Sequence, residues 1–201
     1  MSPRPDLARS VEEAVTAHPH VVSVQLVGSR ASGTATALSD WDFTVEVDDF
    51  PSVESDLPSL VSELEPLAQQ WDRLGPTEYR CYMLMLPGPA KVDLIFPGVA
   101  HRPSPPWQVS ADTLPGIDAH FWDWILWLTS KRSAGKGRLV AEQLASMSHH
   151  LLQPMGVPEV PDSIEEAVAA YVTARDRLQT RFEVRIPRRL EREVRPIVVR
   201  A

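Results

Sequence analysis

The sequence predicts an α/β (α+β) fold in which a small mixed β-sheet comes first and an all-helical region follows. Up to residue 99, short runs rich in β-branched and aromatic residues alternate with helical patterns, whereas beyond residue 116 the pattern is helical throughout. Residues 100–116 contain four prolines, which disfavour regular structure. We therefore expect a first domain at residues 1–99, a linker at 100–116 and a helical domain at 117–201.

The opening elements are predicted from apolar spacing and from turn residues. Residues 6–17 repeat apolar side chains at three- and four-residue steps and predict a helix. Residues 21–27 are short and rich in valine, so they predict a strand that runs into Gly28. We expect a short helix to begin within residues 31–35, and a second strand at 41–47.

The rest of the first domain combines a helical stripe with a hairpin. Residues 52–71 have apolar residues at helical spacing, interrupted by Pro58 and Pro66, and predict one kinked helix or two short ones. Residues 78–86 and 91–96 read as strands joined by a Pro-Gly-Pro connection, so an antiparallel pair is expected.

Three helices are expected in the second domain, at residues 117–130, 137–152 and 164–181. Between the first two, Ser133–Gly137 is similar to part of a phosphate-binding loop. The first glycine of that motif is replaced by Ser130 and no strand precedes it, so we reject this interpretation.

Composition limits the compartment and the partners. The chain has 201 residues, of which 43% are hydrophobic and 23% charged, as in an ordinary soluble globular protein. Its one cysteine, Cys81, excludes an intramolecular disulfide and a Cys-rich zinc cluster. No apolar run reaches the roughly 18 residues of a membrane span, and acidic residues occupy the region where a signal peptide would be apolar. We expect a cytoplasmic protein with no membrane partner.

Charge is unevenly distributed along the chain. The formal net charge of -7 argues against binding a long nucleic acid through its phosphates. Residues 175–201 nevertheless contain nine arginines and only four acidic residues. We interpret this Arg-rich tail as a salt-bridged surface or an oligomer contact, with contact to RNA or an acidic partner as the alternative.

Gly28 and Ser29 form a turn at the end of the first strand. A glycine there lets phosphate oxygens approach the main chain closely, and the serine hydroxyl adds a donor. Taken alone, however, a Gly-Ser pair is most often an ordinary turn.

Asp40 and Asp42 follow shortly afterwards, at the start of the second strand. Residues two apart in a strand face the same side, so the two carboxylates share one small volume while Trp41 and Phe43 face the packed side. Two carboxylates this close repel each other unless a cation lies between them. An oxygen-seeking divalent cation, Mg²⁺ beside nucleotide phosphates, is the natural partner.

A third carboxylate, Asp93, is the only acid in the strand at residues 91–96. A lone Asp in an apolar strand is costly unless it is bound. The alternative to a functional role is that Asp93 is an edge-strand or cap residue. Together with Asp40 and Asp42, a two-metal site becomes the better account, in which one ion holds nucleotide phosphates and the other activates an acceptor oxygen.

Gly28-Ser29, ten intervening residues, Asp40-Trp41-Asp42 and the later Asp93 resemble the DNA polymerase β type nucleotidyltransferase superfamily, in particular its minimal and aminoglycoside-adenylyltransferase-like branches. The resemblance spans residues 21–96. It implies that Asp40 and Asp42 are metal ligands, that Gly28 and Ser29 bind the nucleoside triphosphate, and that Asp93 is a third ligand or the general base. Trp41 departs from the pattern, because smaller aliphatic residues are commoner there.

The expected activity is therefore transfer of AMP from ATP to a hydroxyl of a small molecule, with release of pyrophosphate. ATP would be the co-substrate and two Mg²⁺ ions the cofactors. Two alternatives stay open: an adenylyltransferase that modifies a protein, as in toxin–antitoxin pairs, and a noncatalytic nucleotide-binding scaffold.

Further residues are candidates for the same site. Arg30 lies in the loop that the resemblance covers and is counted among the nucleotide-binding residues. Lys131 and Lys136 could reach the pyrophosphate, with a solvated helix end as the alternative. Glu78 is a possible second base, with an exposed strand carboxylate as the alternative.

Overall fold

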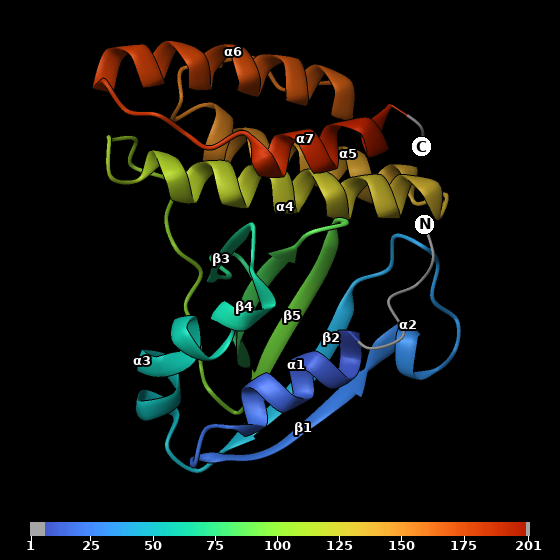
Figure 1. Ribbon diagram of the computed structural model, residues 1–201. Helices are drawn as coiled ribbons and strands as arrows, with labels where there is room; N and C mark the ends of the chain where they lie inside the picture. The colour runs from blue at the N-terminus through green and yellow to red at the C-terminus, as the bar shows by residue number, and fades with distance from the viewer. Residues whose placement is uncertain (1–6, 200–201) are drawn as a thin grey trace. The chain divides into compact units, whose positions relative to one another are not determined.

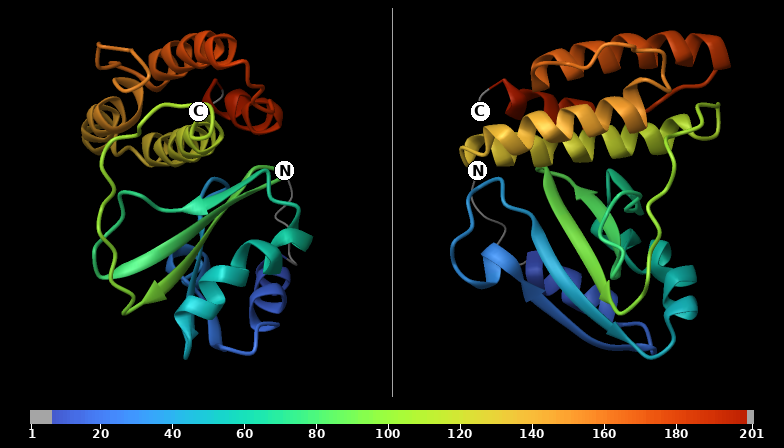
Figure 2. Two further views of the ribbon diagram at one scale, coloured as in Figure 1. Left: turned by 90° about the vertical axis from the view of Figure 1, so that its left-hand side faces the viewer. Right: turned by 180° about the vertical axis from the view of Figure 1, so that it is seen from behind.

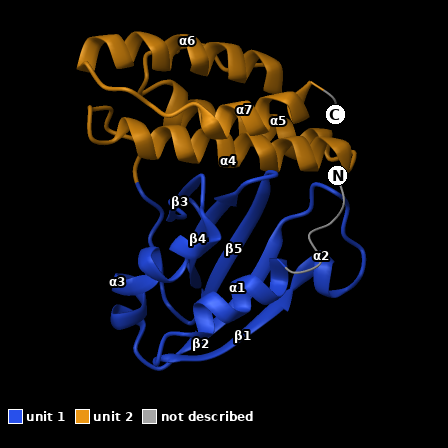
Figure 3. Cartoon of the chain, in the orientation of Figure 1, with its two compact units in different colours: residues 1–104 blue, residues 105–201 orange. Residues whose placement is uncertain are grey.

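The computed structural model describes residues 7–199 and divides the chain into two compact units, residues 1–104 and 105–201 (Figure 3). Asp6, the first residue of the expected opening helix, lies outside the described residues, as does the end of the Arg-rich tail at residues 200–201.

A five-stranded mixed sheet forms the centre of the first unit (Figure 1). Its strands, in spatial order, are β1 (Val21–Val27), β2 (Trp41–Val47), β5 (Ala90–Pro97), β4 (Tyr79–Leu86) and β3 (Ala68–Trp71). Only β2 and β5 pair in parallel, and the other neighbours are antiparallel. The mixed sheet, the first two strands and the β4–β5 hairpin are confirmed.

Helices α1 (Leu7–Thr16) and α3 (Phe50–Leu60) lie on the same face of this sheet (Figure 2). Asp49 caps α3 by accepting a hydrogen bond from the Ser52 N–H at 3.3 Å. One strand residue in two faces these helices, which is the alternation that strand geometry requires. The core that results contains these buried side chains: Leu7, Val11, Val15, Phe43, Val45, Val53, Leu57, Val61, Tyr82, Leu84, Leu86, Val92, Leu94 and Phe96.

Two expectations for this unit are wrong. The helix expected at residues 52–71 ends at Leu60 and is followed by a 3-10 turn and the edge strand β3, because β3 gains a pairing partner in β4. The short helix expected within residues 31–35 begins earlier, as α2 (Gly28–Ala31). Gly28 has φ +68°, which turns the chain at the very end of β1.

Over residues 105–199, the second unit contains four α-helices: α4 (Leu114–Ser133), α5 (Gly137–Met147), α6 (Ile164–Phe182) and α7 (Arg189–Val198). The all-helical expectation is confirmed for its described residues. A five-residue π-helix, η2 (Ser148–Leu152), extends α5. Helix α7 was not expected, because arginines dominate its composition.

Part of the Arg-rich tail forms a salt-bridged cluster inside this unit. Arg175 of α6 is fully buried and pairs with Asp118 of α4 at 3.2 Å and with Glu191 of α7 at 2.8 Å. Arg188 and Arg195 also pair with Glu191, at 3.1 and 3.3 Å. Arg188 and Arg195 are salt-bridged as expected, whereas Arg175 is fully buried and does not belong to the salt-bridged surface that the sequence predicts. Among residues 7–199, no helix has both the length and the apolar character needed to cross a bilayer.

Candidate active site

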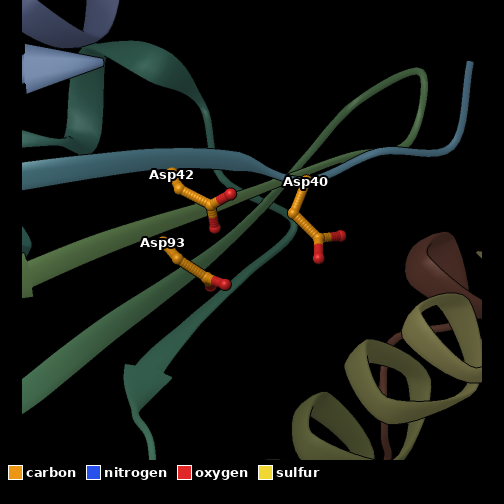
Figure 4. Close-up of side chains that lie close together, drawn as sticks. All are labelled: Asp40, Asp42 and Asp93. Atoms are coloured by element: carbon orange, nitrogen blue, oxygen red, sulfur yellow. The ribbon is translucent and has the colours of Figure 1, made fainter. Parts of the chain in front are cut away.

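The parallel pairing of β2 and β5 brings the three predicted acids together. Asp42 and Asp93 are partners in the register of this pair. Asp40 lies two residues before Asp42, so it is directed to the same side (Figure 4). One carboxylate oxygen from each of the three residues lies within 4.8 Å of the others, and all three side chains are partly buried.

Gly28 lies against this cluster because β1 pairs with β2 and its last residue, Val27, is opposite Asp42. A Cβ atom added at Gly28 would lie 2.6 Å from Oδ2 of Asp42, so any side chain there would force the carboxylate to move. The glycine thus satisfies two requirements at once, a left-handed backbone and contact between main chain and carboxylate. Ser29 follows in α2 and is half-buried.

Arg30 is directed toward its own loop. Its Nε donates to the carbonyl oxygens of Ser39 and Asp40, at 3.1 Å each, and its Nη2 donates to that of Ser39 at 2.6 Å. Its guanidinium also lies over the Trp41 ring, 3.9 Å from the centroid. Burial lowers the pKa of Arg30 while Asp40 and Asp42 oppose that shift, and an arginine stays protonated in either case.

These contacts explain the unusual tryptophan between the two acids. The Trp41 ring packs against the core and provides the surface on which the arginine lies. Arg30 thereby ties the start of β2 to the turn after β1 and closes the loop at residues 31–39.

Lys91 is a site neighbour that the sequence analysis did not identify. Its Nζ donates to Oδ1 of Asp93, and its side chain is only 6% exposed. The two residues lie two apart in β5, so strand alternation alone would have placed them on one face.

The donor set fits an oxygen-seeking divalent cation. Carboxylate oxygens are the ligands that Mg²⁺ prefers, and no softer nitrogen or sulfur donor belongs to this group. Within residues 7–199, it is the one cluster of three or more acidic, histidine or cysteine side chains with ligand atoms this close together.

Three further residues were expected at this site. Glu78 is exposed in the turn before β4 and does not belong to the acidic cluster. Lys131 and Lys136 belong to the second unit: Lys131 Nζ lies 4.9 Å from the centroid of the Trp127 ring, and Lys136 is exposed just before α5. Their assignment to nucleotide binding stays a prediction.

Comparison with known families supports the resemblance noted in the sequence. Residues 7–79 match the model of a family described as nucleotidyltransferase domain. The matched segment includes Gly28, Ser29, Asp40 and Asp42 and ends before Asp93, which only the structure connects to the others. No curated protein matches the chain significantly.

Solved structures with a similar chain path include three transferases or their complexes. An aminoglycoside 6-adenyltransferase from Bacillus subtilis is 9% identical, with a TM-score of 0.37 and coverage of 98% of both chains. A cytoplasmic RNA terminal U-transferase is 18% identical, with a TM-score of 0.36 and coverage of 65% of this chain and 38% of that one. The polymerase core of TRAMP, an RNA surveillance complex, is 13% identical, with a TM-score of 0.39 and coverage of 86% and 58%. These TM-scores are too low to indicate a shared substrate.

Proposed function

We propose that this protein transfers AMP from ATP to a hydroxyl group of a small molecule and releases pyrophosphate. The match of residues 7–79 to the model of the nucleotidyltransferase domain family supports nucleotidyl transfer in general. The proposal rests mainly on one observation: one carboxylate oxygen each from Asp40, Asp42 and Asp93 lies within 4.8 Å of the others, beside the glycine turn that follows β1. Three carboxylates this close repel one another, and a bound divalent cation would relieve that repulsion.

Asp40 and Asp42 would hold Mg²⁺, and Asp93 would complete the ligand set for two ions. The cations would supply charge that stabilises the phosphoryl oxygens and activates the acceptor hydroxyl. Asp93 is also the proposed general base, since it belongs to the cluster whereas Glu78 is exposed outside it. Its carboxylate would take the proton of the acceptor hydroxyl as the new O–P bond forms and the bond to the pyrophosphate breaks.

The turn at Gly28 and Ser29 is the proposed cradle of the triphosphate, because a main chain without a side chain admits phosphate oxygens closely. The bonds of Arg30 to two carbonyl oxygens favour a role in shaping the loop over direct contact with the nucleotide.

The proposal of a small acceptor is supported by charge. A chain with a net charge of -7 repels long polyanions and attracts small hydroxylated compounds that carry amino groups. An aminoglycoside-like molecule combines both features, hydroxyl groups and positive charge.

The test is incubation of the full chain with ATP labelled at the α-phosphorus, Mg²⁺, a panel of hydroxylated amines and a cell lysate. We expect the label to move to a small molecule, and Asp42→Asn to abolish that movement without lowering the melting temperature. Asp48→Asn is the matched control, because Asp48 is an exposed carboxylate just after β2 that pairs with His20 at 2.8 Å. Its transfer rate should equal that of the parent.

The outcomes separate the alternatives. Label on a protein band in place of a small molecule would identify a protein-modifying adenylyltransferase. Binding of ATP with no transfer to any acceptor would favour a noncatalytic scaffold. Equal transfer by the parent and Asp42→Asn would contradict the assignment of the site.

A further inference from the structure

We propose that β1 (Val21–Val27) is a contact between two copies of this chain, which pair their β1 strands antiparallel about a two-fold axis at Gln25. The contact lies at an edge of the sheet and does not depend on the proposed transfer reaction.

The outer edge of β1 is unpaired among the described residues. Strand β1 is the first in the spatial order of the sheet and pairs only with β2 (Figure 1). Within residues 7–199, no backbone–backbone hydrogen bond links residues 22–26 to any segment other than β2. In an antiparallel pair, every second residue directs its N–H and C=O away from the partner strand. A row of main-chain donors and acceptors is therefore left at this edge.

Strand β1 lacks most of the features that keep edge strands from pairing. Such strands are usually short, carry charges or proline, or are interrupted by a bulge. The opposite edge strand, β3, has only four residues, whereas β1 has seven, with no charged residue and no proline. Its irregularity lies between Val21 and Ser23, and residues 23–27 pair regularly with β2. Residues 23–27 thus form a regular, uncharged edge that can bind another strand.

The regular part of β1 is complementary to a second copy of itself. A two-fold axis at Gln25 brings Val24 of each copy opposite Leu26 of the other. Both residues pack against the core side of the sheet, so apolar side chains meet there. On the other face the exposed Gln25 meets Gln25, and each amide can donate to and accept from the other. This symmetry favours a second copy of the chain over an unrelated peptide.

Charge and size indicate how strong the contact is. Each copy carries a net charge of -7, so two copies repel each other, and an uncharged strand lets them meet without like charges directly opposite. The edge of one strand buries much less than the about 800 Å² per partner of a standard interface. We therefore expect a reversible dimer that depends on protein concentration.

The same axis brings the second copy close to the glycine turn. Counting along both strands from Gln25, the partner's Val22 lies beside Gly28. Val22 is 64% exposed, although it is a large apolar residue on a strand. The contact would cover this side chain and the main chain of the turn together.

The first test measures the mass of the full chain by sedimentation equilibrium from about 1 to 200 µM, a range suited to a small interface. The mass of the parent should rise from monomer toward dimer. Gln25→Lys places two ammonium groups opposite each other and should weaken association by about tenfold or more. Ser55→Lys adds the same charge at an exposed position of α3 and should leave association unchanged.

The second test uses cysteine cross-linking to check the register. Residues directly opposite in an antiparallel pair have Cα atoms about 4.5–5.5 Å apart, which suits a disulfide. Gln25→Cys should therefore give a covalent dimer under mild oxidation. In Ser23→Cys the two new thiols would be offset by four residues, roughly 13 Å along the strands, and should not cross-link. The parent, whose one cysteine is the buried Cys81, should stay a monomer on a non-reducing gel.

Thermal unfolding shows which variants are folded, and if Gln25→Lys is not, the cysteine variants decide. The inference is overturned if the parent stays monomeric throughout the concentration range, or if folded Gln25→Lys associates as strongly as Ser55→Lys. Equal cross-linking of Ser23→Cys and Gln25→Cys would also overturn it, as would no cross-linking of either. None of these measurements involves ATP, so their failure is distinguishable from failure of the transfer assay.

Discussion

Replacement of Gly28 by alanine tests the geometry of the site most directly. The added Cβ would lie 2.6 Å from Oδ2 of Asp42, and ordinary contact begins at 3.4 Å, so the carboxylate must move by roughly 0.8 Å. An alanine at φ +68° also costs about 1–2 kcal/mol of backbone strain. Because the carboxylate can rotate away, most of the effect falls on the site and little on the fold.

A misplacement near 1 Å can reduce a reaction rate by about 100-fold, so Gly28→Ala should lower the rate of AMP transfer by that order. The backbone strain should lower the melting temperature by roughly 2–8 °C. The assay is the initial rate of label transfer at saturating ATP and acceptor, measured together with thermal unfolding.

Gly33→Ala is the matched control for this change. Gly33 has φ +72°, so the backbone strain is similar, but no atom lies within 4 Å of the added Cβ. The control should lose similar stability and keep its transfer rate. If both variants transferred AMP at the same rate, the close approach of Gly28 to Asp42 would have no bearing on the reaction and the reasoning would be refuted.

Two other predictions concern arginines in different units. Arg30→Ala should accelerate amide hydrogen exchange across residues 31–40 and lower the transfer rate about tenfold. The reason is that the loop that positions Asp40 loses the hydrogen bonds donated by Arg30. A loss of ATP affinity with unchanged hydrogen exchange would instead indicate that Arg30 binds the nucleotide directly. Arg175→Met should lower the free energy of unfolding by about 3–5 kcal/mol in urea denaturation, because the carboxylates of Asp118 and Glu191 lose their common partner. A change below about 1 kcal/mol would contradict that role of Arg175.

Local patterns in the sequence were sufficient to predict the parts of the site that depend on one strand or one turn. Strand alternation places Asp40 and Asp42 on one face, and a glycine after an apolar strand indicates a sharp turn with an open main chain. The same alternation puts Lys91 beside Asp93, so this pair was also within reach of the sequence.

Features that depend on distant pairing could not be predicted in the same way. Strand β3 (Ala68–Trp71) has only four residues and two glutamines, and it becomes a strand because it pairs with β4. Helix α7 is different, since Leu190, Val194 and Val198 recur every four residues and are buried. That spacing could have revealed the helix, but the arginine content led to the interpretation of a tail.

The register between β2 and β5 determines which acid of β5 lies beside Asp42, and packing of the hydrophobic core fixes this register. Val92 and Leu94, on either side of Asp93, are fully buried. A shift of β5 by one residue would turn these two side chains to the other face and place Asp93 in the apolar core, at a cost of several kcal/mol. The hydrophobic packing of the opposite face therefore fixes which acid meets Asp42. The register thus joins Asp40 and Asp42, which the family match covers, with Asp93, which lies outside it, in one cluster.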